Sequence, residues 1–264
     1  MSALSRNNVK VKGSPDAPPM FFAHGYGCDQ NMWRLVAPAF ERDHRLVLFD
    51  HVGAGRSDHA AFCPAKYGSL EGYADDIIEI GRALGVKGAV FVGHSVSAMM
   101  GVIAAIKAPE LFSRLVLVAP SPCYINEGDY HGGFTREEIG ELLDSLDKNH
   151  LGWSAAMAPV IMGNPDRKEL AEELTESFCR TDPKIARHFA RTTFLSDERA
   201  LLERVNLPTL ILQCSDDVIA PRSIGDYMHG RMPFGKLVVM KATGHCPNLS
   251  APEETTAAIR AFLS

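Results

Sequence analysis

Short apolar segments alternate with helix-like segments along most of the chain. The apolar segments are rich in β-branched and aromatic side chains, which predicts buried strands. They are Asn8–Lys12, Pro19–Ala23, Arg45–Asp50, Ala89–Gly93, Leu115–Ala119, Thr209–Cys214 and Leu237–Met240. Because helical spacing fills the intervals between them, we expect an α/β fold with a mostly parallel central sheet and helices on both faces.

The clearest helix is predicted over residues 69–84, with Ser69 as its N-cap. Its apolar stripe consists of Leu70, Tyr73, Ala74, Ile77, Ile80 and Leu84. The side chains expected to face water are Asp75, Asp76, Glu79 and Arg82. This division into two faces is typical of a helix that packs on a sheet.

The alternation stops near Ser121 and resumes near Leu207. Four helices and no strand are predicted between these points. Their signals are the capping box Thr135–Glu138, the run around Trp153, Asn164-Pro165 and Asp182-Pro183. An all-helical block between two strands of one sheet is an insertion. We therefore expect a core of residues 1–120 and 197–264, and a four-helix cap of residues 121–196 over the carboxyl edge of the sheet, where ligands bind.

One serine stands between a predicted strand and a predicted helix. Residues 92–98 read Val-Gly-His-Ser-Val-Ser-Ala. A sharp turn at this point would raise the Ser95 hydroxyl above the sheet as a nucleophile elbow. The match to Gly-x-Ser-x-Gly is imperfect, because Ser97 fills the fifth position. Taken alone, the motif also fits a serine that only caps the next helix.

Two later groups supply the chemistry that a serine nucleophile needs. A serine hydroxyl requires a base, and the base requires an orienting acid. Asp216 and Asp217 follow the sixth predicted strand, and His245 follows the seventh. We favour Asp217, because Pro221 four residues later marks the next helix start, and Asp216 then serves as a turn residue or hydrogen-bond partner. The chain order predicts a Ser95–His245–Asp217 triad.

Backbone N–H donors for an oxyanion are predicted at two places. Val96 directly follows the nucleophile. The loop at residues 24–27 reads His-Gly-Tyr-Gly, and its glycines let a backbone N–H turn inward. Tyr26 is the candidate donor there. His94 is expected to pack and form hydrogen bonds without reacting.

A second glycine-rich segment, at residues 50–57, is interpreted as a turn. Asp50 and Ser57 are expected to bond the backbone locally there, and no catalytic role is assigned to either.

Composition narrows the class of protein. The chain has 264 residues, 46% of them hydrophobic and 22% charged, with a net charge of −5. Since no basic cluster is present, nucleic-acid binding is not expected. No apolar run approaches the roughly 18 residues that span a bilayer. The start of the chain shows no signal-peptide pattern, so a cytoplasmic location is expected.

The cysteines are scattered, without the spacing of a metal site. Six are present, and in a chain without a secretion signal they predict reduced, mostly buried thiols. We expect no metal and no cofactor.

Several segments together resemble the RsbQ-like α/β-hydrolases of bacteria and, more distantly, the plant strigolactone and karrikin receptors. These segments are His24–Gln30, Gly93–Ala98, Pro109–Ser113, Asp129–Phe134 and Gly244–Pro247. The resemblance implies an α/β-hydrolase fold with a four-helix cap and the triad named above. It also implies an apolar pocket lined by Tyr26, Val96, Tyr124, Phe134, Leu142, Trp153, Met157, Phe189, Phe194 and Val218. Tyr26 replaces the more usual phenylalanine, which would place an extra hydroxyl near the nucleophile.

Two functional hypotheses follow. The first is a serine hydrolase that cleaves a small apolar ester or lactone through an acyl-Ser95 intermediate. The second, implied by the resemblance, is a ligand-responsive regulator with slow hydrolysis and a PAS-containing PP2C-type phosphatase as partner in sigma-factor stress signalling. A perhydrolase or a C–C hydrolase would use the same triad. Ser95 excludes a haloalkane dehalogenase, which needs a carboxylate at the elbow.

Overall fold

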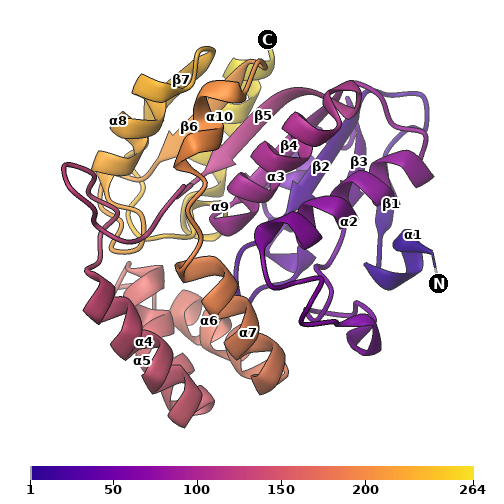
Figure 1. The fold of residues 1–264 in the computed structure, drawn as a ribbon. Coiled ribbons are helices and arrows are strands. Elements are labelled where there is room, and N and C mark those ends of the chain that lie inside the picture. The colour runs from indigo at the N-terminus through magenta and orange to yellow at the C-terminus, as the bar shows by residue number, and fades with distance from the viewer. Residues whose placement is uncertain (1) are drawn as a thin grey trace.

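The computed structural model describes residues 2–264. Within them, seven strands form one sheet in the order β1-β3-β2-β4-β5-β6-β7 (Figure 1). The strands are β1 (Lys10–Lys12), β2 (Pro19–Ala23), β3 (Arg45–Leu48), β4 (Ala89–His94), β5 (Phe112–Val118), β6 (Thr209–Gln213) and β7 (Gly235–Val239). Strand β1 is antiparallel to β3, and all other neighbours are parallel. The predicted mostly parallel sheet is therefore confirmed.

The sheet is apolar on both faces, because alternate residues of each strand enter different halves of the core. In β2, Met20 and Phe22 pack on one side, whereas Phe21 and Ala23 pack on the other. The first side is covered by α9 (Pro247–Ser250) and α10 (Pro252–Leu263). The second is covered by α2 (Leu70–Ala83), α3 (Val96–Lys107) and α8 (Arg222–Arg231). A short helix, α1 (Ala3–Arg6), contacts α2.

Helix α2 departs from the prediction at two positions. Ser69 is the N-cap residue by position, but its side chain forms no capping hydrogen bond. Asp76 was expected to face water, yet it is fully buried. Its carboxylate accepts from Arg6 at 2.7 Å, Lys66 at 2.6 Å and the Tyr67 hydroxyl at 2.9 Å. A buried charge needs such partners, and all three lie outside α2, where the spacing of the helix alone cannot reveal them.

Four helices lie between β5 and β6. They are α4 (Arg136–Lys148), α5 (His150–Met162), α6 (Lys168–Arg180) and α7 (Pro183–Phe194), and we call them the cap. They group together beyond one end of the sheet in Figure 1. The capping box of Thr135 and Glu138 is present, and the Asp182 carboxylate caps α7. No helix in residues 2–264 is long and apolar enough to cross a membrane.

Helix α6 begins later than predicted. The Asn164-Pro165 pair was expected to open it, but its first residue is Lys168. Asn164 instead adopts a left-handed conformation, with φ of 53°. Its side-chain amide donates to the carbonyls of Met162 at 3.0 Å and Thr243 at 2.9 Å. The segment between α5 and α6 is thus a turn, held in part by the hydrogen bond to Thr243, which lies outside the cap.

Candidate active site

Ser95 occupies the sharp turn between β4 and α3. Its backbone has φ of 56° and ψ of −125°, a conformation that is costly for a residue with a side chain. The turn closes tightly, since a Cβ at Gly93 would lie 2.6 Å from the Ser97 carbonyl oxygen. Ser95 forms no side-chain cap on α3. This geometry favours the nucleophile elbow over the helix-capping alternative.

Ser97 takes the place of the glycine expected at the end of the motif. It is fully buried. Its hydroxyl donates to the His24 carbonyl, and His51 Nε2 lies 2.7 Å from it. The departure from the motif therefore leaves no buried hydroxyl without a partner.

Ser95, His245 and Asp217 form a continuous chain of hydrogen bonds. The Ser95 hydroxyl lies 2.7 Å from His245 Nε2, and His245 Nδ1 lies 2.7 Å from the Asp217 carboxylate. All three residues are at most 5% exposed. Asp217 also accepts from the backbone N–H of Ile219 and Ala220. The carboxylate is thus held as an acceptor with Nδ1–H directed at it, which leaves Nε2 free to receive a proton from the serine.

The neighbouring acid, Asp216, has a different place. Its side chain is exposed, and its carbonyl accepts from the Gly244 N–H at 2.8 Å. Of the two aspartates weighed from the sequence, only Asp217 reaches the imidazole. Asp216 acts through its backbone, as a partner of the loop that carries His245.

The loop at residues 24–27 lies directly against Ser95. A Cβ at Gly25 would be 3.3 Å from Ser95 Cβ and 2.6 Å from His94 Nδ1, so only glycine fits this approach. The next residue is Tyr26, the predicted backbone donor. The second predicted donor, Val96, is the first residue of α3, and such residues have no intrahelical partner for their N–H. Both backbone groups therefore flank the serine.

His94 packs and donates a hydrogen bond, as the sequence suggested. Its Nε2–H donates to the His245 carbonyl at 2.7 Å. Burial lowers the pKa of His94 to about 3, with a further contribution from His245. His94 is therefore a neutral donor at neutral pH.

The segment 50–57 forms the local bonds that were predicted: the Asp50 carboxylate accepts from the Arg56 N–H, and the Ser57 hydroxyl donates to the Ala54 carbonyl. Asp50 also accepts from the backbone N–H of Gln30, 20 residues away, which the prediction of purely local bonding did not include.

A small cavity opens above the Ser95 hydroxyl. Its volume is about 30 Å³, enough for a water molecule. Pockets that enclose small-molecule ligands measure roughly 300–1,000 Å³. Tyr124 lines the cavity; its buried hydroxyl makes no hydrogen bond of standard geometry within residues 2–264, although it lies near enough to Ser95 to interact with it. Because burial also raises the pKa of Tyr124, the hydroxyl stays protonated and can donate to a bound molecule.

Three of the predicted pocket residues line this cavity: Tyr26, Tyr124 and Phe194. Trp153 and Phe189 form a layer behind the Tyr26 ring, with centroids 6.1 and 5.6 Å from it. Phe134, Leu142 and Met157 are partly buried elsewhere against the core. Val218 is 50% exposed, and the next residue, Ile219, lines the cavity instead.

The expected position of the Tyr26 hydroxyl was wrong. The hydroxyl was expected near the nucleophile, but it donates to the Ala186 carbonyl on α7 at 3.2 Å. The extra oxygen relative to phenylalanine therefore joins the loop beside Ser95 to the cap.

Several lining residues were not predicted: Cys28, Ile161, Leu174, Phe178, Thr193, Ile219 and Cys246. Helical spacing carried a signal for two of them, since Leu174 and Phe178 share one apolar stripe of α6. All six cysteines are unpaired, and four of them are buried, Cys28 and Cys246 among them.

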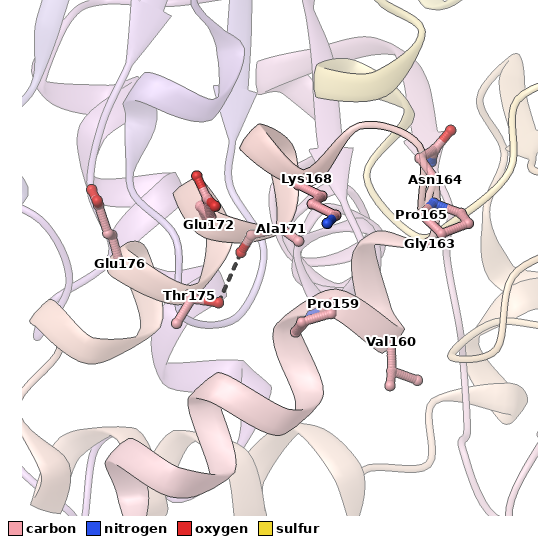
Figure 2. Close-up of a pocket in the computed structure, with 10 residues that line it drawn as sticks. All are labelled: Pro159, Val160, Gly163, Asn164, Pro165, Lys168, Ala171, Glu172, Thr175 and Glu176. Atoms are coloured by element: carbon pink, nitrogen blue, oxygen red, sulfur yellow. Dashed lines mark hydrogen bonds between the residues drawn. The ribbon is translucent and has the colours of Figure 1, made fainter.

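A larger hollow of about 710 Å³ lies on the outer side of the cap, between α5 and α6. Figure 2 shows the Gly163–Pro165 turn at one end of it and Glu176 at the other. Neither Ser95, His245 nor Asp217 lines this groove.

Comparison with known proteins supports the fold and the family. A hydrolase from Oleispira antarctica superposes with a TM-score of 0.96 at 40% identity, over 99% of this chain and 96% of that one. The strigolactone esterase D14 of Arabidopsis thaliana is 38% identical over 98% of this chain and 97% of its own length. The karrikin insensitive 2 receptor CA of Petunia hybrida is 38% identical over 94% and 92%. The model of the alpha/beta hydrolase family matches residues 20–259, and the chain belongs to that family.

Proposed function

We propose that this protein is a serine hydrolase that cleaves a small apolar ester or lactone through an acyl-Ser95 intermediate. The observation that carries the proposal is the buried chain of hydrogen bonds from Ser95 through His245 to Asp217, with 2.7 Å at each step. Relatives of this chain that are named esterases support the same chemistry.

The first half of the reaction forms the acyl-enzyme. Ser95 Oγ attacks the carbonyl carbon while its proton passes to His245 Nε2. The carbonyl oxygen becomes an oxyanion and accepts from the N–H groups of Tyr26 and Val96. The bond to the alcohol oxygen then breaks, and His245 returns the proton to that oxygen.

The second half releases the acid. Water attacks the acyl carbon, and its proton passes to His245 Nε2. The bond to Ser95 Oγ then breaks, and the proton restores the serine hydroxyl. The Asp217 carboxylate, hydrogen-bonded to Nδ1, stabilises the imidazolium that forms in each half.

The cavity limits the substrate. Its lining is mostly apolar; besides Ser95 and His245, the residues in it that carry a polar group are His94, Tyr26, Tyr124 and Thr193, with the thiols of Cys28 and Cys246. At about 30 Å³, it accepts a small acyl group only if the cap side chains move. Tyr124 offers its hydroxyl to an oxygen of the substrate.

The test is covalent labelling by a fluorophosphonate with mass mapping, beside hydrolysis of p-nitrophenyl acetate. We expect labelling at Ser95. Ser95→Ala should lose labelling and several orders of magnitude in kcat, roughly 10⁶ in the best-studied serine enzyme. Labelling at another serine, or parental turnover in Ser95→Ala, would reject the proposal.

A second function, an RsbQ-like or receptor-like regulator, is favoured by one observation: the cavity above Ser95 measures only about 30 Å³, as suits slow turnover and a cap that must move. Relatives of similar identity are named receptors. In this hypothesis a ligand shifts the cap and a partner, such as a PAS-containing PP2C-type phosphatase, binds the altered surface. Slow turnover combined with ligand-dependent capture of that phosphatase would favour it over the esterase.

A further inference from the structure

The loop that carries His245 is held from two sides. On the core side, the His245 carbonyl accepts from His94 Nε2 at 2.7 Å. On the cap side, the His245 N–H donates to the Ile161 carbonyl, near the end of α5, at 2.9 Å. The backbone of the proposed catalytic base therefore bridges core and cap, and its position depends on both.

The cap side of this contact is unusually close. A Cβ at Gly244 would lie 1.9 Å from the Met162 carbonyl oxygen, and a Cβ at Gly163 would lie 3.1 Å from Gly244 Cα. Both glycines have positive φ values, 78° and 61°. Two backbones thus run against each other here without side chains between them. A small displacement of the cap turn would be transmitted directly to residue 245.

Asn164 supplies the side chain that fixes this turn. Its amide donates to the Thr243 carbonyl on the His245 loop and to the Met162 carbonyl on the cap. Its φ of 53° is one that asparagine tolerates better than most residues. The turn forms the end of the outer groove in Figure 2, so Asn164 lies outside the cavity above Ser95.

We propose that Asn164 is a positioning residue for the reaction: its amide joins the cap turn to Thr243 and so holds His245 at proton-transfer distance from Ser95. The inference rests on the proposed function, since it assigns His245 the role of base. Asn164 acts only through His245. Its loss should therefore change the rate of the chemical step and leave substrate binding unchanged.

Two substitutions separate the amide from the backbone conformation. Asn164→Gly keeps the left-handed turn and removes both hydrogen bonds. We expect it to lower kcat for p-nitrophenyl acetate about three- to tenfold at constant KM, the range that one or two ordinary hydrogen bonds support. Asn164→Asp keeps the shape but sets a carboxylate against two carbonyl oxygens, so its loss should be larger. The rate of fluorophosphonate labelling at Ser95 should fall in the same order.

Arg167→Ala is the matched control. Arg167 lies in the same segment and also joins cap to core, by donating to the Ser250 carbonyl at 2.6 Å, but it does not touch the His245 loop. It should leave kcat within about twofold of the parent, whatever it does to the free energy of unfolding.

Three outcomes would overturn the inference: parental kcat in Asn164→Gly, a change confined to KM, or an equal loss of kcat in Arg167→Ala. If the parent protein itself neither labels at Ser95 nor hydrolyses the ester, the proposed function fails and the inference fails with it. A parent that does both, with variants that match it, rejects the role of Asn164 alone.

Discussion

The core and the cap both reach Ser95, but they contribute different things. The core provides the reacting side chains, each in the segment that follows a strand and each buried. The cap provides rings above the serine and hydrogen bonds to the loops around it. Ser177 on α6 donates to the Gly27 carbonyl, and Tyr26 donates to Ala186 on α7.

This difference has a chemical consequence. The core decides which atoms react, because strand ends fix Ser95 and Asp217 relative to each other. The cap decides how large the substrate is and how firmly the loops at residues 24–27 and 243–245 are held. Changes in the core should therefore abolish turnover or unfold the chain, whereas changes in the cap should alter substrate range and rate in graded steps.

After Ser95 itself, the largest effect should come from the orienting acid of the core. Asp217→Asn keeps the size of the side chain but removes the charge that stabilises the imidazolium. We expect kcat for p-nitrophenyl acetate to fall about 10⁴-fold, as in other Ser-His-Asp sites. Asp216→Asn is the matched control, since its exposed side chain does not reach His245. An equal loss in both variants would contradict the assignment.

Two phenylalanine truncations compare the regions directly. Phe22 is fully buried in β2 against Trp33, so Phe22→Ala should lower the free energy of unfolding by about 3–5 kcal/mol. Phe178 lines the cavity and stacks on Trp153, so Phe178→Ala should cost less, about 3 kcal/mol, because the cap can relax around the gap.

The substrate range separates the same two variants. Phe178→Ala enlarges the space beside Ser95, so hydrolysis of p-nitrophenyl hexanoate should rise relative to the acetate. Phe22→Ala should leave that ratio unchanged. Urea unfolding measures the free energy of unfolding of both variants, and steady-state kinetics on both esters measures the ratio. A changed ratio in the core variant would show that the division between the regions is wrong.

Acid should destabilise the protein through histidines of the core. Burial lowers the pKa values of His24, His51 and His94, the last to about 3. Below about pH 6.5 the unfolded chain binds protons that these folded rings do not. Their stabilising contribution is therefore complete above that pH and is lost as the pH falls.

Urea unfolding at pH 7.5, 6 and 5 measures this loss. One such histidine changes the free energy of unfolding by about 1.4 kcal/mol per pH unit well below pH 6.5. His94→Gln keeps a donor for the His245 carbonyl and removes one titrating ring, so its slope should be shallower by about that amount. An unchanged slope would mean that His94 is protonated in the folded protein.

The sequence predicted the core better than the cap, for a physical reason. Each strand and each reacting residue of the core has a local sequence signal. Strand ends and tight turns are determined by a few consecutive residues, as in Gly93–Ser97. The pocket lining depends on how the four cap helices pack over the loops of the core. The same dependence reaches the core loop after β6, where Val218 is exposed and its neighbour Ile219 is buried. Asn164 carried a misleading local signal, because Asn-Pro often begins a helix, and its real partner, Thr243, lies 79 residues away.

The smallest effect should come from the hydroxyl that joins the two regions. Tyr26→Phe removes the hydrogen bond to the Ala186 carbonyl and keeps the ring contacts with Trp153, Phe178 and Phe189. We expect the free energy of unfolding to fall by about 0.5–1.5 kcal/mol, the ordinary net contribution of one hydrogen bond.

The kinetic constants of the same variant test the direction of that hydroxyl. Since it points to α7, kcat and KM for p-nitrophenyl acetate should stay within about twofold of the parent. A tenfold rise in KM would mean that the hydroxyl leaves Ala186 and binds the substrate when the cap moves. In that case Tyr26 would belong to the binding site through its side chain as well as its backbone. One residue would then both bind substrate and contact the cap, and the division of roles between core and cap would not hold for it.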